Sequence, residues 1–267
     1  MDQHDHLRTQ VAVADKPFEI RFPRAEANAE DYDQDEEWCE VRIDDELRRI
    51  RFHDYGELYS IPGLYEQLFY DELKCDSPRT VCALLAEHIE TCDRDPEKLR
   101  VLDVGAGNGI VGEELKGLGA GTVVGVDIIE EAAEAARRDR PEVYDDYKVL
   151  DFTEMSEGDR RELTERRFNC LTTVAALGFG DIPPDAFAEA YNLVEPGGHI
   201  AFNIKEDFMD DRYNTGFSRL IRDALEDSTL ELEAERAYRH RLSVAGDPLN
   251  YIAMVGEKRR DLPVEAP

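Results

Sequence analysis

The segment LRVLDVGAGNGIVGEEL, Leu99–Leu115, determines how this chain of 267 residues is interpreted. Its first part is an apolar run typical of a buried strand, its middle carries glycines at alternate positions (Gly105, Gly107, Gly109), and its last part has the apolar spacing of a helix. A strand that passes through glycines into a helix N-terminus commonly binds a nucleotide in α/β folds. The segment therefore predicts a nucleotide site, and the kind of nucleotide has to come from other residues.

The alternation of strand and helix continues through the rest of the chain. Short apolar runs predict strands near residues 100–104, 122–126, 146–150, 168–174 and 198–203. Helical spacing and capping residues predict helices near residues 109–117, 129–138, 154–165, 184–193 and 216–226. Two strand-like runs, 230–244 and 249–259, are separated by a short turn and are expected to pair antiparallel at one edge. The pattern predicts an α/β fold with a doubly wound, mostly parallel sheet.

The N-terminal part of the chain has a different pattern. Residues 1–35 are polar and acidic and are expected to lie loose or to wrap the surface. Apolar residues that alternate with charged ones on either side of Asp44 and Asp45 predict a hairpin near 38–53. Helix-like spacing follows in SIPGLYEQLFYDELK, residues 60–74. We therefore expect a hairpin and helical cap ahead of the main sheet.

A clearer helix begins at SPRTV. Ser77 is its expected N-cap and Pro78 its expected first helical residue. The resulting domain division is an N-terminal extension and cap over 1–76, a main domain over 77–260 and a tail over 261–267.

The glycines alone do not identify the nucleotide. Counted from Gly105 they give GxGxG, with Ile110 where a dinucleotide fingerprint needs its third glycine; counted from Gly107 they give GxGxxG, but that frame begins after the strand has turned. Asp103 discriminates better, because a carboxylate within the apolar strand is costly unless it is paired. It would be unfavourable beneath a pyrophosphate, whereas S-adenosylmethionine carries a sulfonium and an ammonium and no phosphate. Asp103 therefore favours S-adenosylmethionine.

Two further carboxylates follow the next two predicted strands. Asp127 closes GTVVGVD and can accept both hydroxyls of a ribose, which dinucleotides and S-adenosylmethionine share. Asp151 follows YKVL directly and can accept from the amino group of an adenine. Phe152 and Ile128 would then lie against the faces of the ring.

With these residues the chain resembles the class I S-adenosylmethionine-dependent methyltransferases. The resemblance covers about Leu99 to Arg260 and rests on VLDVGAGNG, GVD, LDF and LVEPGGHIAFNI, which stand in the order and spacing of that family. Within the class, residues 172–208 are similar to the single-domain group related to the methyltransferase of the Williams–Beuren syndrome region. That second likeness implies no substrate.

The resemblance implies a fold, a cofactor and site residues. The fold would be a Rossmann-like sheet of seven strands with an antiparallel last strand, and the cofactor would be S-adenosylmethionine, leaving as S-adenosylhomocysteine. Asp127 would hold the ribose and Asp151 the adenine. The methionine part would lie against the turn formed by Gly105, Ala106, Gly107, Asn108 and Gly109, with Asp103 beneath it.

No catalytic residue can be assigned from the sequence. AALGFGD, residues 175–181, follows the predicted fourth strand and holds small apolar residues without an evident base. DIPPDAF lies too far beyond the strand for the [DNS]PP[YFW] motif that stacks a flipped base, so Pro183 and Pro184 are interpreted as a helix start near Asp181.

We expect the acceptor pocket to be built by the cap and by the segment after the fifth strand. The candidate substrate contacts are His53, Tyr55, Tyr59, Tyr65 and Asn203. Packing in the core is the alternative role for the tyrosines, and a structural role is the alternative for His53, which could also act as a base.

The sequence thus predicts a methyltransferase that acts on an oxygen or nitrogen of a small molecule. A protein methyltransferase is one alternative, because a basic substrate tail would suit an acidic surface. A non-catalytic protein that binds S-adenosylmethionine is another, because AALGFGD shows no base. A nicotinamide oxidoreductase is disfavoured by Asp103.

The charge of the chain is strongly negative. It has 61 Asp and Glu against 32 Lys and Arg, a formal net charge of −29 at pH 7. A basic partner protein is one interpretation; the favoured one is adaptation to a salty cytoplasm, where salt screens the self-repulsion of a carboxylate-rich surface. Nucleic acid is disfavoured as a partner, because binding phosphates needs a positive surface.

The cysteines and the apolar runs bear on the cellular location of the protein. The five cysteines form no CxxC pair, so neither a disulfide framework nor a metal site is expected. No apolar run is long enough to span a membrane, and the first residues do not resemble a signal peptide. We therefore expect a cytoplasmic monomer or homodimer.

Overall fold

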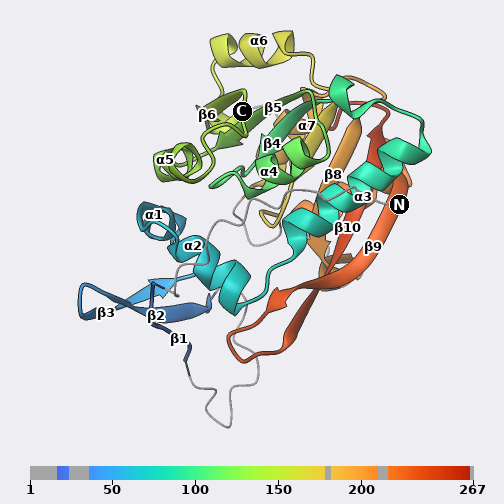
Figure 1. Cartoon of the computed structure of the whole chain (residues 1–267). Helices are drawn as coiled ribbons and strands as arrows, with labels where there is room; N and C mark the ends of the chain where they lie inside the picture. The colour runs from blue at the N-terminus through green and yellow to red at the C-terminus, as the bar shows by residue number, and fades with distance from the viewer. Residues whose placement is uncertain (1–16, 24–35, 178–181, 210–215, 265–267) are drawn as a thin grey trace, which may run out of the picture.

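A seven-stranded sheet with the order β6-β5-β4-β7-β8-β10-β9 forms the centre of the molecule (Figure 1). The computed structural model describes residues 17–23, 36–177, 182–209 and 216–264. The strands are β4 (Arg100–Val104), β5 (Thr122–Asp127), β6 (Asp146–Val149), β7 (Cys170–Thr173), β8 (His199–Lys205), β9 (Leu230–Leu242) and β10 (Pro248–Lys258). The helices after the cap are α3 (Ser77–Thr91), α4 (Ile110–Gly117), α5 (Glu130–Asp139), α6 (Glu157–Glu165), α7 (Pro184–Asn192) and α8 (Gly216–Glu226).

The strand directions confirm the predicted sheet. β6, β5, β4, β7 and β8 pair parallel, whereas β10 lies antiparallel between β8 and β9. The carboxyl ends of β4, β5 and β7 therefore meet at one edge, where α/β folds bind their ligands. The expectations for residues 1–16, 24–35, 178–181 and 265–267, including Asp181 at a helix start, lie outside the described residues.

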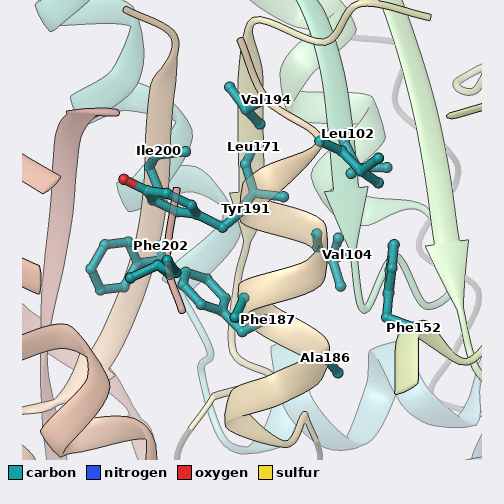
Figure 2. Close-up of a cluster of buried hydrophobic side chains, with 14 of the residues drawn as sticks. Leu102, Val104, Phe152, Leu171, Ala186, Phe187, Tyr191, Val194, Ile200 and Phe202 are labelled. Carbon is teal, nitrogen blue, oxygen red and sulfur yellow. The ribbon is translucent and has the colours of Figure 1, made fainter. Parts of the chain in front are cut away.

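Helices cover both faces of the sheet. α3 and α4 pack on one face and α7 and α8 on the other. Figure 2 shows Phe187 and Tyr191 of α7 against Phe202 of β8. At the carboxyl end of α7 the buried Lys258 ammonium donates to the carbonyls of Tyr191, Asn192 and Val194. These carbonyls lie at the negative end of the helix dipole, so the Lys258 ammonium fixes α7 to β10.

The start of α3 corrects one sequence expectation. Ser77 is the first helical residue rather than the N-cap, and Asp76 takes the N-cap position. The Ser77 hydroxyl instead lies 2.6 Å from both the Tyr238 hydroxyl and Nδ1 of His240. A tertiary hydrogen bond has thus replaced the local cap, which sequence alone could not indicate.

The cap contains the predicted hairpin. β1 (Ile20–Arg21), β2 (Trp38–Ile43) and β3 (Glu46–Arg51) form a small antiparallel sheet. Its turn places Asp44 and Asp45 at φ 49° and 67°, a left-handed conformation that Asp tolerates better than most residues. Helix α1 (Tyr55–Ser60) follows the hairpin and was not predicted from the sequence. The helix-like segment 60–74 becomes α2 (Leu64–Glu66) and a π-helical turn, η2 (Gln67–Glu72). The boundary between cap and main domain at residue 76 stays a prediction.

Helix α1 brings the cap onto the main sheet's carboxyl edge. It packs against α5, where Tyr59 meets Ala132 and Ala135. The small alanine side chains allow the two helices to approach closely. Across the described stretches of the chain, no helix combines the length and apolar character needed to cross a membrane.

Candidate functional site

A cavity of about 340 Å³ lies between the carboxyl edge of the sheet and the cap. The sheet side contributes the ends of β4 and β5 and the segments after β6 and β7. The cap contributes the two residues before α1, three residues of α1 and one residue of α2. The described residues that line it are His53, Asp54, Tyr55, Gly56, Tyr59, Tyr65, Val104, Gly105, Val126, Asp127, Ile128, Ile129, Leu150, Asp151, Phe152, Val174, Ala175, Ala176, Ile182, Pro183 and Ala186. Three of these carry carboxylates and none is Lys or Arg.

The glycine turn has the conformation that its sequence predicts. Gly105, Gly107 and Gly109 have φ of 72°, 53° and 89°, which side chains other than glycine rarely adopt. A Cβ on Gly105 would lie 2.9 Å from Cβ of Ala176, and one on Gly107 would collide with the Tyr59 hydroxyl. The turn is therefore packed so closely against neighbouring side chains that only glycine fits at these two positions.

Of the five predicted turn residues, only Gly105 lines the cavity. Tyr59 covers Gly107 from the cap side, and Tyr147 donates to the Gly107 carbonyl over 2.8 Å. Asn108 is 3 % exposed and donates to Glu66, and Ala106 is also buried. Their predicted contact with the methionine part of the cofactor stays a prediction.

Asp127 holds the turn and also faces the cavity. Its Oδ2 accepts from the Gly107 N–H over 2.9 Å, and its Oδ1 accepts from the N–H groups of Ile128 and Ile129 over 2.8 and 3.3 Å. Burial raises the pKa of this carboxyl, and the three N–H groups act in the opposite direction. Asp127 thus ties the end of β5 to the glycine turn after β4.

Asp103 lies beneath the turn but outside the cavity. It is 1 % exposed, and its two oxygens accept from the hydroxyls of Tyr144 and Thr172 over 2.7 Å each. Burial raises its pKa to about 7. The described geometry therefore gives Asp103 protein hydroxyls as partners; neither Tyr144 nor Thr172 carried a recognisable signal in the sequence.

The segment after β6 provides an apolar wall with one carboxylate. Asp151 accepts from the N–H and hydroxyl of Thr153 over 2.8 and 2.7 Å and lines the cavity. Phe152 is buried beside it, whereas Ile128 is 58 % exposed at the cavity wall. An exposed large apolar side chain next to a cavity is a common feature of ligand sites.

The structure brings four of the five substrate candidates to the cavity. His53, Tyr55, Tyr59 and Tyr65 all line it, and the ring centroids of Tyr59 and Tyr65 are 4.7 Å apart. Burial raises the pKa of Tyr59 well above its usual range, so its hydroxyl stays protonated. The fifth candidate, Asn203, does not line the cavity.

Asn203 lies behind the cavity wall, which corrects its expected direct contact. It is fully buried in β8, and its Oδ1 accepts from the N–H of Ala175 over 2.7 Å. Ala175 lines the cavity and has a φ of 57°. Asn203 thus fixes a left-handed residue of the wall and makes no contact with the cavity itself.

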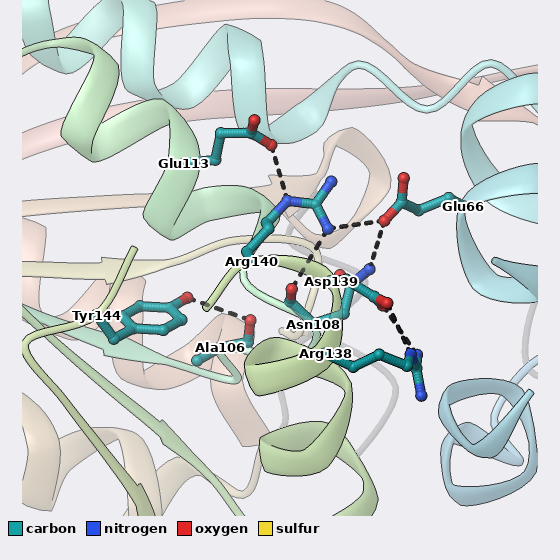
Figure 3. Close-up of polar contacts among 8 residues, drawn as sticks. All are labelled: Glu66, Ala106, Asn108, Glu113, Arg138, Asp139, Arg140 and Tyr144. Atoms are coloured by element: carbon teal, nitrogen blue, oxygen red, sulfur yellow. Dashed lines mark hydrogen bonds and ion pairs between the residues drawn. The ribbon is translucent and has the colours of Figure 1, made fainter. Parts of the chain in front are cut away.

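A polar cluster joins the cap to the glycine turn (Figure 3). Arg140, at the end of α5, donates to Glu66 of the cap and to Glu113 of α4 over 2.7 Å each. Glu66 also accepts from the Asn108 side chain over 3.0 Å. Sequence reasoning missed this cluster, since its members lie in different elements and share no spacing.

Comparisons with known proteins agree with this fold and with the methyltransferase class. A family model described as a methyltransferase domain matches residues 76–240, more than half of the chain. Two curated relatives are named ubiquinone biosynthesis O-methyltransferase. That of Thiobacillus denitrificans is 35% identical over 104 residues, covering 39% of this chain and 43% of the relative. That of Alkalilimnicola ehrlichii is 30% identical over 157 residues, covering 58% and 61%. This chain thus spans less than two thirds of the length of either relative.

A solved structure supports the fold. The N-methyltransferase NodS from Bradyrhizobium japonicum, in complex with S-adenosylhomocysteine, aligns with a TM-score of 0.54 at 12% identity, covering 78% of this chain and 97% of that chain. The sheet order and the nucleotide turn define an α/β nucleotide-binding protein of the Rossmann-like class. The chain belongs to the methyltransferase-domain family, and within it to the class I S-adenosylmethionine-dependent methyltransferases. S-adenosylmethionine is the cofactor of this class, as the sequence predicted.

Proposed function

We propose that this chain transfers a methyl group from S-adenosylmethionine to an oxygen of a small molecule, with nitrogen as the alternative acceptor atom. The single observation that carries the proposal is the cavity at the carboxyl edge of β4, β5 and β7, closed on the far side by the cap. The names of the two curated relatives support an oxygen acceptor.

The cavity residues fit S-adenosylmethionine. Gly105 lines the cavity at the end of β4, and Asp127 and Asp151 place acceptor oxygens at the ends of β5 and β6. The described wall carries no cationic side chain, which suits a ligand with a positively charged sulfur. When bound, this cofactor supplies an electrophilic methyl group.

In this proposal, different residues of the chain bind different parts of the cofactor. Asp127 accepts from the ribose hydroxyls, and Asp151 accepts from the adenine amino group. Phe152 and Ile128 flank the adenine ring. The carboxylates of the wall disfavour an anionic acceptor, because like charges would meet inside a cavity partly closed to water.

The cap residues would align the acceptor. Methyl transfer depends on holding the nucleophile in line with the methyl group and on excluding water. Tyr55, Tyr59 and Tyr65 provide aromatic faces for this purpose, and His53 is the imidazole on the described wall that can accept a hydroxyl proton.

Calorimetry tests the proposal. S-adenosylmethionine, S-adenosylhomocysteine and NADH are titrated into the wild type and into Asp127→Ala in high KCl. The two sulfur ligands are expected to bind the wild type, and Asp127→Ala is expected to lose that binding. Asp145→Ala is the matched control, because Asp145 also accepts a backbone N–H of β5, from Val123 over 2.8 Å, but lies outside the cavity.

The outcomes separate the alternatives. NADH binding in place of the sulfur ligands would reject the methyltransferase proposal. Binding of both sulfur ligands without turnover of any tested acceptor would favour a non-catalytic binding protein. Absence of all binding to the folded wild type would leave the glycine turn a purely architectural element.

A further inference from the structure

A second, smaller hollow of about 40 Å³ adjoins the main cavity. Four residues line both spaces: His53, Tyr55, Tyr65 and Ala175. Its polar wall beyond these shared residues comes from Cys75, His240, Arg241 and Tyr251. A water needs about 10–15 Å³ of such space, so the hollow has room for a small substituent of a larger molecule. The hollow therefore lies directly beside the main cavity, along the side chains of these four residues.

The wall of the hollow is fixed by a buried hydrogen-bond network. Oδ1 of Asn203 accepts from the Ala175 N–H, so the Asn203 amide nitrogen is its donor end. That nitrogen lies 2.9 Å from the Tyr238 hydroxyl and 3.3 Å from the Ser77 hydroxyl, and it donates to both oxygens. The hydroxyl protons of Tyr238 and Ser77 must then point elsewhere.

The network sets the tautomer of His240. The Ser77 oxygen lies 2.6 Å from the Tyr238 hydroxyl and 2.6 Å from Nδ1 of His240. If Tyr238 donates to Ser77 and Ser77 donates to Nδ1, every donor of the network has an acceptor. In the reverse order Nδ1 would donate to Ser77 and Ser77 would donate to Tyr238. The Tyr238 proton would then have no acceptor in the network. Nδ1 therefore accepts, and the proton of His240 is on Nε2.

Nε2 of His240 is left for a ligand. The side chain is 6 % exposed and lines the hollow, and the described residues offer its Nε2 no hydrogen-bond partner. Burial lowers the pKa of His240 well below its usual value, so the ring stays neutral. An acceptor atom bound in the hollow would give this donor a hydrogen-bond partner.

The neighbouring charges favour a neutral oxygen. Arg241 lines the same hollow, but its guanidinium donates to the buried Glu37 carboxylate and to the Leu242 carbonyl. The pair leaves no net charge beside the neutral His240. A carboxylate would lose its hydration there without gaining a cation, whereas a carbonyl needs only a donor.

We propose that the hollow is a subsite for a carbonyl oxygen of the acceptor molecule, to which His240 donates its Nε2 proton. The inference rests on the proposed function, because the reacting hydroxyl would lie in the main cavity. The substrate class is then a small hydroxyl compound with an uncharged carbonyl substituent.

Binding of matched phenols tests the subsite. The full chain is saturated with S-adenosylhomocysteine and titrated with 4-hydroxyacetophenone, 4-ethylphenol and 4-hydroxybenzoate. The first two have nearly the same shape, but 4-hydroxyacetophenone has a carbonyl group where 4-ethylphenol has a methylene group. We expect the ketone to bind about tenfold more tightly than the ethyl compound, as for one buried hydrogen bond, and the carboxylate to bind worst. His240→Phe should abolish the preference, and His88→Phe, on the distant part of α3, should retain it.

Two further measurements keep the test decisive if His240→Phe does not fold. Nitrogen chemical shifts of His240 in the wild type should show the proton on Nε2, and a proton on Nδ1 would overturn the inference. Ser77→Ala should release the tautomer and reduce the ketone preference. Equal affinities for the two neutral phenols, or binding of neither, would also overturn it. Failure of S-adenosylhomocysteine itself to bind would reject the proposed function instead, and the subsite with it.

Discussion

The hydroxyl of Tyr144 donates to Oδ2 of Asp103 over 2.7 Å, and Thr172 occupies the other oxygen of the same buried carboxyl. The two hydroxyls stabilise the charged form, yet burial prevails and raises the pKa of Asp103 to about 7. A titratable group therefore lies directly under the glycine turn, with a midpoint close to neutral pH.

Asp103 should make the stability of the protein depend on pH. In the unfolded chain its carboxyl titrates near its ordinary pKa of 3.8, so between about pH 4 and 7 the folded state binds more protons. Its contribution to the free energy of unfolding then falls as pH rises through this window and is constant above it. We expect Asp103→Asn to gain stability relative to the wild type by up to about 4 kcal/mol between pH 4 and 8. Urea unfolding of both proteins measures this difference.

The wild type and Asp103→Asn share all other carboxylates. The difference between their free energies of unfolding therefore reports the titration of Asp103 alone. Tyr144→Phe provides the matched variant. It removes one donor, so the pKa of Asp103 in the folded state should rise and the upper end of the window should move to higher pH, while the lower end stays in place. Parallel stability curves for the wild type and Asp103→Asn would show that the buried carboxyl does not titrate in this range.

The contact of Glu66 with Arg140 should control the release of the cofactor. Arg140 donates to Glu66 in the cap and to Glu113 in α4 over the same distance of 2.7 Å, but only Glu66 joins the cap to the turn. Glu66→Gln weakens a charge-assisted hydrogen bond, so dissociation of S-adenosylhomocysteine should become severalfold faster. Stopped-flow displacement measures the rate. Glu113→Gln is the control and should leave the dissociation rate unchanged. Equal acceleration in both variants would mean that Arg140 affects the rate by stabilising α5 and not by holding the cap.

The sequence predicted the elements of the main domain because each has its own local signal. The strand expected over 122–126 is Thr122–Asp127, and the helix expected over 184–193 is Pro184–Asn192. The helix expected from residue 154 begins only at Glu157, because the Ser156 hydroxyl accepts from the Asp159 N–H and caps it. Local patterns thus located the turn and the carboxylates after the strands.

The partners of these residues could not be predicted. Tyr144 and Thr172 reach Asp103 from other elements, and Ser77 meets His240 across most of the chain's length. Such contacts depend on how elements pack, which periodicity does not report. The same reason explains why Asn203 was expected in the cavity and lies behind its wall.

Asn203 should stabilise the wall of the cavity through Ala175. A non-glycine residue at a φ of 57° costs about 1–2 kcal/mol and needs support from its surroundings. Asn203→Ala removes that support and should lower the free energy of unfolding by about 2 kcal/mol while weakening the binding of S-adenosylhomocysteine. Thermal unfolding and calorimetry check the two effects. Ala175→Gly relieves the strained conformation, so adding it to Asn203→Ala should restore part of the binding; without such restoration, the effect of Asn203 would not pass through this turn.

The negative charge of the chain should make folding depend on salt. With a formal net charge of −29, self-repulsion opposes the compact state unless salt screens it. Raising KCl from about 0.1 to 3 M shortens the screening length from about 10 Å to below 3 Å, so the melting temperature should rise steeply over this range. Scanning calorimetry at several KCl concentrations measures it. If the melting temperature is the same throughout, the acidic surface serves another purpose; binding of an arginine-rich peptide at low salt, lost at moderate salt, would then support a basic protein partner.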